Sequence, residues 1–141
     1  MRRVLFGFVL GVSSSVAAKP LVQSLDASPH HVAPNGKAEV TEWGRGENAW
    51  FGLLTLDADA SVPEHQDLTE EYIHVLEGSG TLTMDGVTHP LGPGSSVVMP
   101  AGATVQYENG PNTLIAVQVF AGPESADKYA AWPLRAQPTP Q

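Results

Sequence analysis

Short runs of apolar residues, separated by turn-forming residues, occupy the chain from about residue 37 to residue 122. Within several of these runs, apolar and polar residues alternate, which predicts β-strands that bury one face. We expect eight strands, at residues 38–43, 50–56, 71–76, 80–84, 87–91, 96–99, 104–107 and 113–120. So many short strands at this spacing predict a β-sandwich or a β-barrel.

Turn residues divide the predicted strands and indicate one tight hairpin. Asp85 and Gly86 lie between two alternating runs, and both central positions of a two-residue hairpin turn need positive φ angles. Residues 124–132 are expected to form one short helix, and residues 133–141 a frayed tail. The sequence contains neither an internal repeat nor a second domain.

The first eighteen residues have the features of a secretory signal peptide. Arg2 and Arg3 precede an apolar stretch at residues 4–12 and small residues at 13–18, so cleavage after Ala18 is expected. The alternatives are a buried first strand or a membrane anchor, but the apolar run is too short to span a bilayer comfortably. We predict a periplasmic or secreted protein, organised as signal peptide (1–18), extended arm or edge strand (19–36), barrel (37–122) and C-terminal helix with tail (123–141).

The composition and charge of the chain exclude several kinds of site and partner. Disulfides, thiolate metal sites and cysteine nucleophiles are excluded because the chain has no cysteine. The 7 basic and 15 acidic residues give a net charge of −8, and cleavage would remove two arginines, which leaves −10. Such a surface repels phosphate backbones and anionic headgroups, so we expect neither a nucleic-acid partner nor membrane binding after cleavage. The sequence has no phosphate loop and no dinucleotide fingerprint, and we expect no nucleotide, flavin or haem.

The segment from residue 65 to residue 78 reads HQDLTEEYIHVLEG. It resembles the first signature of the cupin superfamily, in which two histidines separated by one residue precede a glutamate, and a glycine follows seven residues later. His65, Glu71 and Gly78 match that pattern, whereas Asp67 stands where the second histidine is expected.

The second cupin signature is matched further along the chain. Gly94, Pro100, Gly102 and Asn109 are in register with it, but Val105 occupies the position of its histidine. The spacing between the two signatures is also that of cupins. The resemblance implies a small single-domain cupin with an all-β, antiparallel jelly-roll barrel. It also implies a homodimer, because partner subunits often cover the edge strands of this fold.

The alternation within residues 71–76 places an acid in the barrel interior. Glu71, Ile73 and Val75 share one face of the predicted strand. A carboxylate among apolar side chains is costly unless it has a partner, a proton or a metal. His65 and Asp67 are two residues apart and would share a face on a strand. One cation among His65, Asp67 and Glu71 would therefore stabilise the buried acid.

The resemblance implies that these three side chains bind a metal. Cupin sites usually have three histidines and one glutamate, and here His65 and Glu71 are carried over while Asp67 supplies a hard oxygen ligand. One imidazole and two carboxylates favour manganese or ferrous iron over copper. In the alternative interpretation no metal binds, His65 and Glu71 form a hydrogen-bonded pair, and Asp67 is a loop residue near the barrel mouth.

Different classes of function remain open at this point. The protein is either a divalent-metal-binding enzyme that acts on a small oxygenated substrate, or a non-catalytic barrel that binds a small molecule or is purely structural. In the enzyme, Glu71 would serve as metal ligand or base and Tyr107 as a second catalytic group. The substrate or ligand pocket is predicted to contain Ile73, Val75, Val105 and Tyr107.

Overall fold

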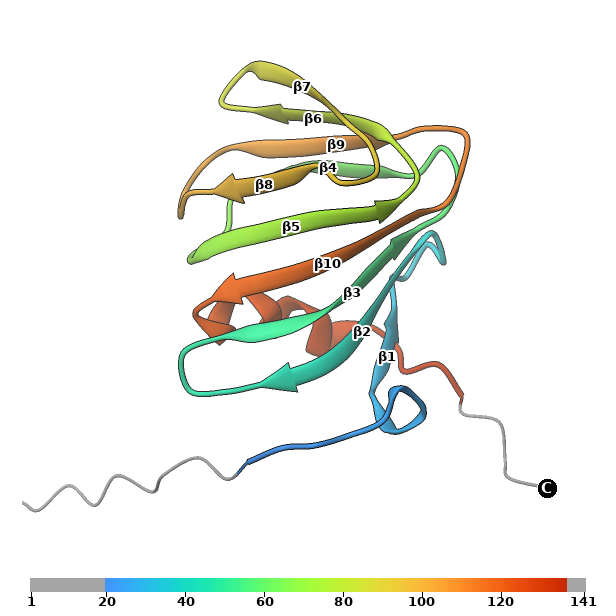
Figure 1. The fold of residues 1–141 in the computed structure, drawn as a ribbon, viewed down its shortest axis with the longest axis vertical. Helices are drawn as coiled ribbons and strands as arrows, with labels where there is room; N and C mark the ends of the chain where they lie inside the picture. Colours follow the sequence, from blue (N-terminus) through green and yellow to red (C-terminus); the bar gives the residue numbers. More distant parts are fainter. Residues whose placement is uncertain (1–19, 137–141) are drawn as a thin grey trace, which may run out of the picture.

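The computed structural model describes residues 20–136, which form ten strands and two 3₁₀ helices (Figure 1). The predicted signal peptide lies outside the described residues. In chain order the elements are η1 (Leu25–Ala27), β1 (His30–Val32), β2 (Ala38–Arg45), β3 (Trp50–Leu56), β4 (Ser61–His65), β5 (Glu70–Glu77), β6 (Gly80–Met84), β7 (Val87–Leu91), β8 (Ser96–Met99), β9 (Val105–Asn109), β10 (Leu114–Ala121) and η2 (Pro123–Ala131).

The strands form two antiparallel sheets (Figure 1). The larger sheet has the order β1-β2-β3-β10-β5-β8, and the smaller one has the order β4-β9-β6-β7. Buried side chains from both sheets belong to one cluster, so the sheets enclose a common core. The predicted all-β antiparallel fold with one short C-terminal helical segment is confirmed.

All eight predicted strands are present, with ends that differ from the prediction by at most two residues. β1 is an edge strand within residues 19–36, where an extended arm or edge strand was predicted, and the structure adds β4. β4 has the sequence SVPEH and lacks a regular apolar face, so the alternation pattern did not identify it. Pro63 is tolerated in β4 because this strand lies at the edge of its sheet, where a ladder donor can be missing.

The predicted hairpin joins β6 to β7. Asp85 and Gly86 have φ angles of 47° and 81°, as a two-residue hairpin turn requires. Met84 and Val87 pair directly on either side of the turn. The turn prediction is confirmed.

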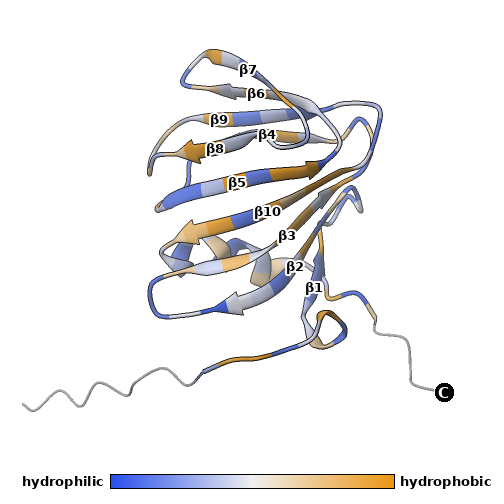
Figure 2. Cartoon of the chain, in the orientation of Figure 1, coloured by the Kyte–Doolittle hydropathy of each residue, from blue (hydrophilic) through white to orange (hydrophobic). Residues whose placement is uncertain are grey.

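Two clusters of buried side chains make up the core, and Figure 2 shows apolar segments along β3, β5 and β10. The larger cluster lies between the sheets and contains Leu56, Ala60, Val75, Leu82, Met99, Ala103, Val105, Tyr107, Leu114 and Ala116. The smaller cluster contains Val40, Trp50, Phe120, Ala126 and Tyr129, of which the last two belong to η2. The C-terminal segment is thus part of the core.

Polar contacts fasten η2 to the barrel. Thr69 Oγ1 donates a hydrogen bond of 3.0 Å to the carbonyl of Gly122 and lies 2.7 Å from Ser125 Oγ. At the exposed side of η2, Arg45 pairs with Asp127. Among residues 20–136, no helix is long and apolar enough to cross a membrane.

The turn into η2 depends on a glycine, which gives a test of this docking. Gly122 has a φ angle of +119°, and a Cβ there would lie 2.4 Å from Thr69 Cγ2. We expect Gly122→Ala to lower the free energy of unfolding by roughly 2 kcal/mol, because it combines backbone strain with a clash. Equilibrium denaturation in urea measures this.

Gly36→Ala is the matched control for this substitution. Gly36 also has a positive φ angle, of +72°, but a Cβ there would meet nothing within 4 Å. Gly36→Ala should lower the free energy of unfolding by roughly 1 kcal/mol, from backbone strain alone. Equal losses in the two variants would show that the approach of Thr69 to Gly122 does not constrain η2.

Candidate functional site

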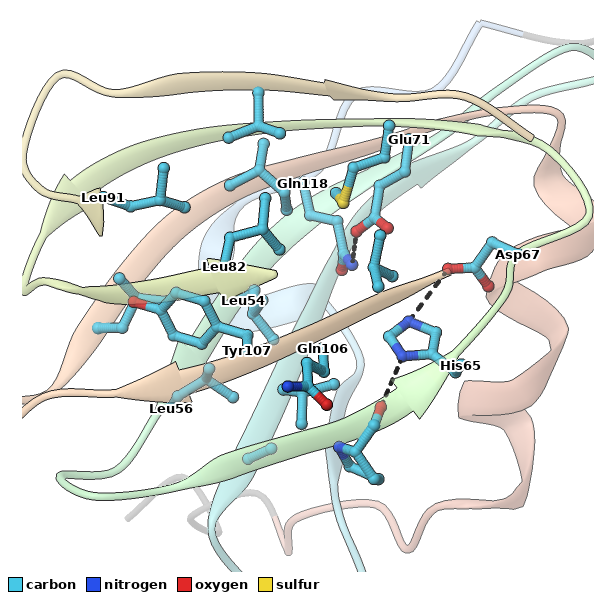
Figure 3. Close-up of a pocket in the computed structure, with 18 of the residues that line it drawn as sticks. Leu54, Leu56, His65, Asp67, Glu71, Leu82, Leu91, Gln106, Tyr107 and Gln118 are labelled. Atoms are coloured by element: carbon cyan, nitrogen blue, oxygen red, sulfur yellow. Dashed lines mark hydrogen bonds and ion pairs between the residues drawn. The ribbon is translucent and has the colours of Figure 1, made fainter. Parts of the chain in front are cut away.

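A cavity of about 330 Å³ lies inside the barrel (Figure 3). Most of its lining is apolar and comes from both sheets: Ala38, Leu54, Leu56, Val62, Ile73, Val75, Leu82, Leu91, Val97, Met99, Val105 and Leu114. The structure brings the predicted pocket residues Ile73, Val75, Val105 and Tyr107 together along this cavity.

Six polar side chains meet at one end of the cavity, which we call the polar end. They are His65, Asp67, Glu71, Gln118, Lys128 and Tyr129. β4 ends at His65, Asp67 follows in the loop, and Glu71 lies at the start of β5, so a short stretch of chain supplies three of them. β10 contributes Gln118, and η2 contributes Lys128 and Tyr129.

Glu71 is held by a buried chain of hydrogen bonds. Its side chain is only 6% exposed, and Gln118 Nε2 donates a 2.6 Å hydrogen bond to Glu71 Oε1. The Tyr129 hydroxyl in turn donates to Gln118 Oε1 at 3.1 Å. This fixes the Gln118 amide, because the opposite orientation would leave the Tyr129 proton without an acceptor among the described residues.

The buried position changes the acidity of both ends of this chain of hydrogen bonds. Burial raises the pKa of Glu71 to about 7; the Gln118 hydrogen bond opposes the rise and the charge of Asp67 adds to it. Burial also raises the pKa of Tyr129 far above its ordinary value, so its hydroxyl remains a donor. Near neutral pH, Glu71 is therefore an acid that can hold or release a proton.

Asp67 forms an ion pair instead of joining Glu71. Lys128 Nζ lies 2.7 Å from Asp67 Oδ1 and 5.0 Å from the centroid of the Phe120 ring. The second oxygen, Oδ2, is buried without a hydrogen-bond partner, and His65 Nε2 lies 3.5 Å from it. Burial would raise the pKa of Asp67, but its contacts with His65 and Lys128 outweigh burial and lower it.

His65 is half-buried and is oriented by the backbone. Its Nδ1 lies 2.9 Å from the carbonyl of Pro63, which can only accept, so Nδ1 carries a proton. Nε2 then faces Asp67 (Figure 3). The interaction with Asp67 is the main reason why the pKa of His65 is raised; burial opposes it.

The sequence placed His65 and Asp67 on one face of a strand, and this is wrong. β4 ends at His65, and the chain leaves the sheet so that the carbonyl of Asp67 accepts a hydrogen bond from the Gly102 amide at 2.9 Å. The alternative in which His65 and Glu71 bond to each other is also not observed, because the partner of Glu71 is Gln118.

The residues of the polar end do not fit the metal site that the cupin resemblance implies. No group of three or more His, Cys, Asp or Glu side chains between residues 20 and 136 is arranged to hold a metal ion. Val105, which pairs with His65 across β4 and β9, puts an apolar side chain at the position of the missing histidine. Lys128 already pairs with Asp67. Metal binding by His65, Asp67 and Glu71 stays a prediction.

Tyr107 lies away from the polar end. Its ring lines the cavity, and its hydroxyl, pointing away from His65 and Asp67 (Figure 3), is 3.4 Å from Asn109 Oδ1. Burial raises the pKa of Tyr107. Its predicted catalytic role stays a prediction.

Gln118, Lys128 and Tyr129 were missed from the sequence. Gln118 interrupts the buried apolar series of β10 (Leu114, Ala116, Phe120), and a polar residue in such a series was a usable signal. Lys128 and Tyr129 lie in a short helix far along the chain, and no local pattern connects them with residues 65–71.

Comparison with known proteins identifies the central part of the chain. Residues 52–118 match the sequence model of the Cupin domain, which confirms the resemblance drawn from the two signatures. A search of curated proteins found no match.

Solved structures show the same fold. The chain is similar to an RmlC-like cupin from Shewanella frigidimarina (TM-score 0.66, 17% identity, 74% of this chain and 92% of the other). It is also similar to a predicted oxalate decarboxylase from Thermotoga maritima (TM-score 0.65, 22% identity, 72% and 99%). A third similar structure is the DMSP lyase DddQ from Ruegeria pomeroyi (TM-score 0.59, 19% identity, 72% and 55%).

The raised pKa of Glu71 predicts a specific pH dependence of stability. Folding favours the protonated form, so this stabilisation is complete below pH 4.5 and is lost as the pH rises through about 7. Glu71→Gln keeps the neutral shape and does not titrate. Its free energy of unfolding, relative to wild type, should therefore rise by about 3 kcal/mol between about pH 4 and pH 9.

Denaturation curves across this pH range measure the difference. Glu77→Gln, at an exposed position of the same strand, controls for the lost charge. His65, Asp67 and Lys128 also face the polar end. They are present in both the wild type and the variant, so their contributions to the pH dependence of stability cancel to first order. A difference that does not vary with pH would contradict the buried acid.

Proposed function

Because residues 52–118 form a cupin domain, we propose that this protein is a barrel that binds a small, largely apolar molecule and does not need a resident metal to do so. The observation that carries this proposal is the apolar cavity of about 330 Å³ that ends in a cluster of polar groups. Cavities of this kind, with apolar walls and a few polar groups, are typical of small-molecule sites.

The energetics of the site support binding better than a purely structural barrel. A barrel filled by its own side chains would leave no cavity of this size. The apolar walls would gain about 25 cal/mol for each Å² that a ligand removes from water. The polar groups would orient the ligand within the cavity.

Export and self-association belong to the same proposal. The signal-peptide features of residues 1–18 support a periplasmic or secreted protein. Tyr72 and Val98 pair across β5 and β8, and both are exposed on the outside of the larger sheet, as is Leu76. Such an exposed apolar patch supports the predicted homodimer.

A metal-dependent enzyme is the second candidate function. It is favoured by the match of His65 and Glu71 to the first cupin signature and by the unpartnered oxygen of Asp67 at the same end of the cavity. A predicted oxalate decarboxylase and a DMSP lyase are among the proteins of similar fold, but at this identity they support the barrel and not the reaction.

Filling the cavity should abolish binding. The neutral apolar dye N-phenyl-1-naphthylamine should gain fluorescence with the wild type, and Val105→Phe should weaken its binding by roughly tenfold or more because the new ring occupies the cavity. Val87→Phe, the same substitution at an exposed position of β7, is the matched control. Equal dye binding by both folded variants would show that the dye does not enter the barrel.

Elemental analysis of untagged protein separates the two candidate functions. We expect far less than one metal ion per chain after incubation with manganese, ferrous iron, zinc and nickel, because the possible ligands do not converge. Near-stoichiometric metal that is lost in both His65→Ala and Glu71→Ala would contradict this. A metal-dependent enzyme would then become the leading function.

A further inference from the structure

The outer face of the larger sheet carries a row of apolar side chains that crosses four strands. Val119 of β10 pairs with Phe51 of β3 on one side and with Tyr72 of β5 on the other. Tyr72 in turn pairs with Val98 of β8. Three members of this row are widely exposed, namely Phe51 at 44%, Tyr72 at 39% and Val98 at 52%. A continuous row of large exposed apolar side chains is typical of a surface that a partner covers.

From this row we infer that a second copy of the chain covers the outer face of the larger sheet, so that two sheets pack back to back about a two-fold axis. The inference rests on the self-association in the proposed function and assigns the surface through which the copies meet. It does not depend on a ligand in the barrel. The smaller sheet and η2 pack on the other side of the larger sheet (Figure 1).

The smaller sheet shows how a solvated face is built in this protein. Thr83 and Thr88 pair across β6 and β7, and Thr81 pairs with Glu108 across β6 and β9. These polar side chains alternate with Leu82, which is buried. An antiparallel sheet that faces water on one side is expected to show this alternation of apolar and polar residues. The larger sheet has apolar residues on both faces, which favours burial of its outer face.

The distribution of charge favours a second copy as the partner. Two identical chains with a net charge of −8 repel each other wherever their acidic surfaces meet. β3, β8 and β10 contain no Asp, Glu, Lys, Arg or His, whereas Glu70 and Glu77 lie at the two ends of β5. An apolar surface without charge at its centre is complementary to itself, and acids at its rim stay in water.

The aromatic end of this face is held in place before association. The Phe51 ring lies over Gly44, where a Cβ would be only 2.5 Å from Cε1 of the ring. Trp43 packs edge-on against the same ring, with the two centroids 6.3 Å apart. Side chains that are already fixed lose little freedom when a partner buries them. Trp43, Phe51 and Tyr72 are therefore suited to anchor the interface, since aromatic residues are enriched in interface cores.

The size of the face sets the expected strength of association. β3, β10, β5 and β8 have 7, 8, 8 and 4 residues. At about 3.3 Å per residue and about 4.8 Å between strands, they cover about 430 Å² of flat sheet on each copy. With the relief of the side chains included, two copies would bury about 1,000 Å², which is near the lower limit for a specific interface. We therefore expect a dimer that dissociates in the micromolar range.

Sedimentation equilibrium of the untagged protein between about 1 and 100 μM tests the inference. We expect the average mass to rise from that of one chain to that of two across this range. Val98→Glu should weaken association by about a hundredfold or more, because the two-fold axis puts two new carboxylates into one apolar interface. Leu76→Glu, at a second exposed position of the same face, should act in the same direction.

Val87→Glu is the matched control. Val87 is 57% exposed and belongs to the smaller sheet, so the substitution adds the same charge away from the proposed interface. It should leave the dimer unchanged. Circular dichroism establishes that each variant is folded, as expected for substitutions at positions that are exposed in the single chain.

The other outcomes separate this inference from the proposed function. If Val98→Glu and Leu76→Glu both associate as the wild type does, the assigned surface is overturned and self-association stands. Equal weakening by Val87→Glu would attribute the effect to net charge and would also overturn the assigned surface. If the wild type stays a single chain up to about 100 μM, the inference and the self-association both fail. The binding of N-phenyl-1-naphthylamine would still test the cavity independently.

Discussion

The burial of the Glu71 carboxyl group is the constraint on which the rest of the site depends. An acid that is 6% exposed in an apolar barrel requires a donor, and Gln118 supplies it. Gln118 can keep its amide in that orientation only because the Tyr129 hydroxyl occupies its oxygen. Since Tyr129 belongs to η2, the buried acid links the barrel interior to the packing of the C-terminal segment.

The ion pair of Asp67 follows the same logic. η2 carries Lys128 over the aromatic rings of the smaller core cluster and places its ammonium on Asp67. One segment therefore contributes the hydroxyl that donates to Gln118, which in turn donates to the buried acid, and a cation to the second carboxylate. η2 is therefore part of the site, since Lys128 and Tyr129 both line the cavity.

Local patterns in the sequence predicted most of the strands. They predicted only three of the six side chains at the polar end, namely His65, Asp67 and Glu71. Alternation identified eight strands, and Asp85-Gly86 identified the hairpin, because each depends on neighbouring residues. β4 was not predicted as a strand because Pro63 and polar residues interrupt its apolar face. The partners of Glu71 and Asp67 were not predicted because they lie 47 and 61 residues away in sequence. A family signature gives the positions of the charged side chains but does not identify the residues that neutralise them.

The replacement at position 105 shows how a ligand position can change the chemistry of a barrel without changing its fold. Val105 still pairs with His65 across β4 and β9, so the ladder is kept. Its side chain, however, extends the apolar wall of the cavity to the edge of the polar end. A carboxylate beside such a wall can be stabilised by a proton, by a cation from the chain, or by a donor on the ligand. Glu71 has the raised pKa expected of the first, and Asp67 has Lys128 as the second.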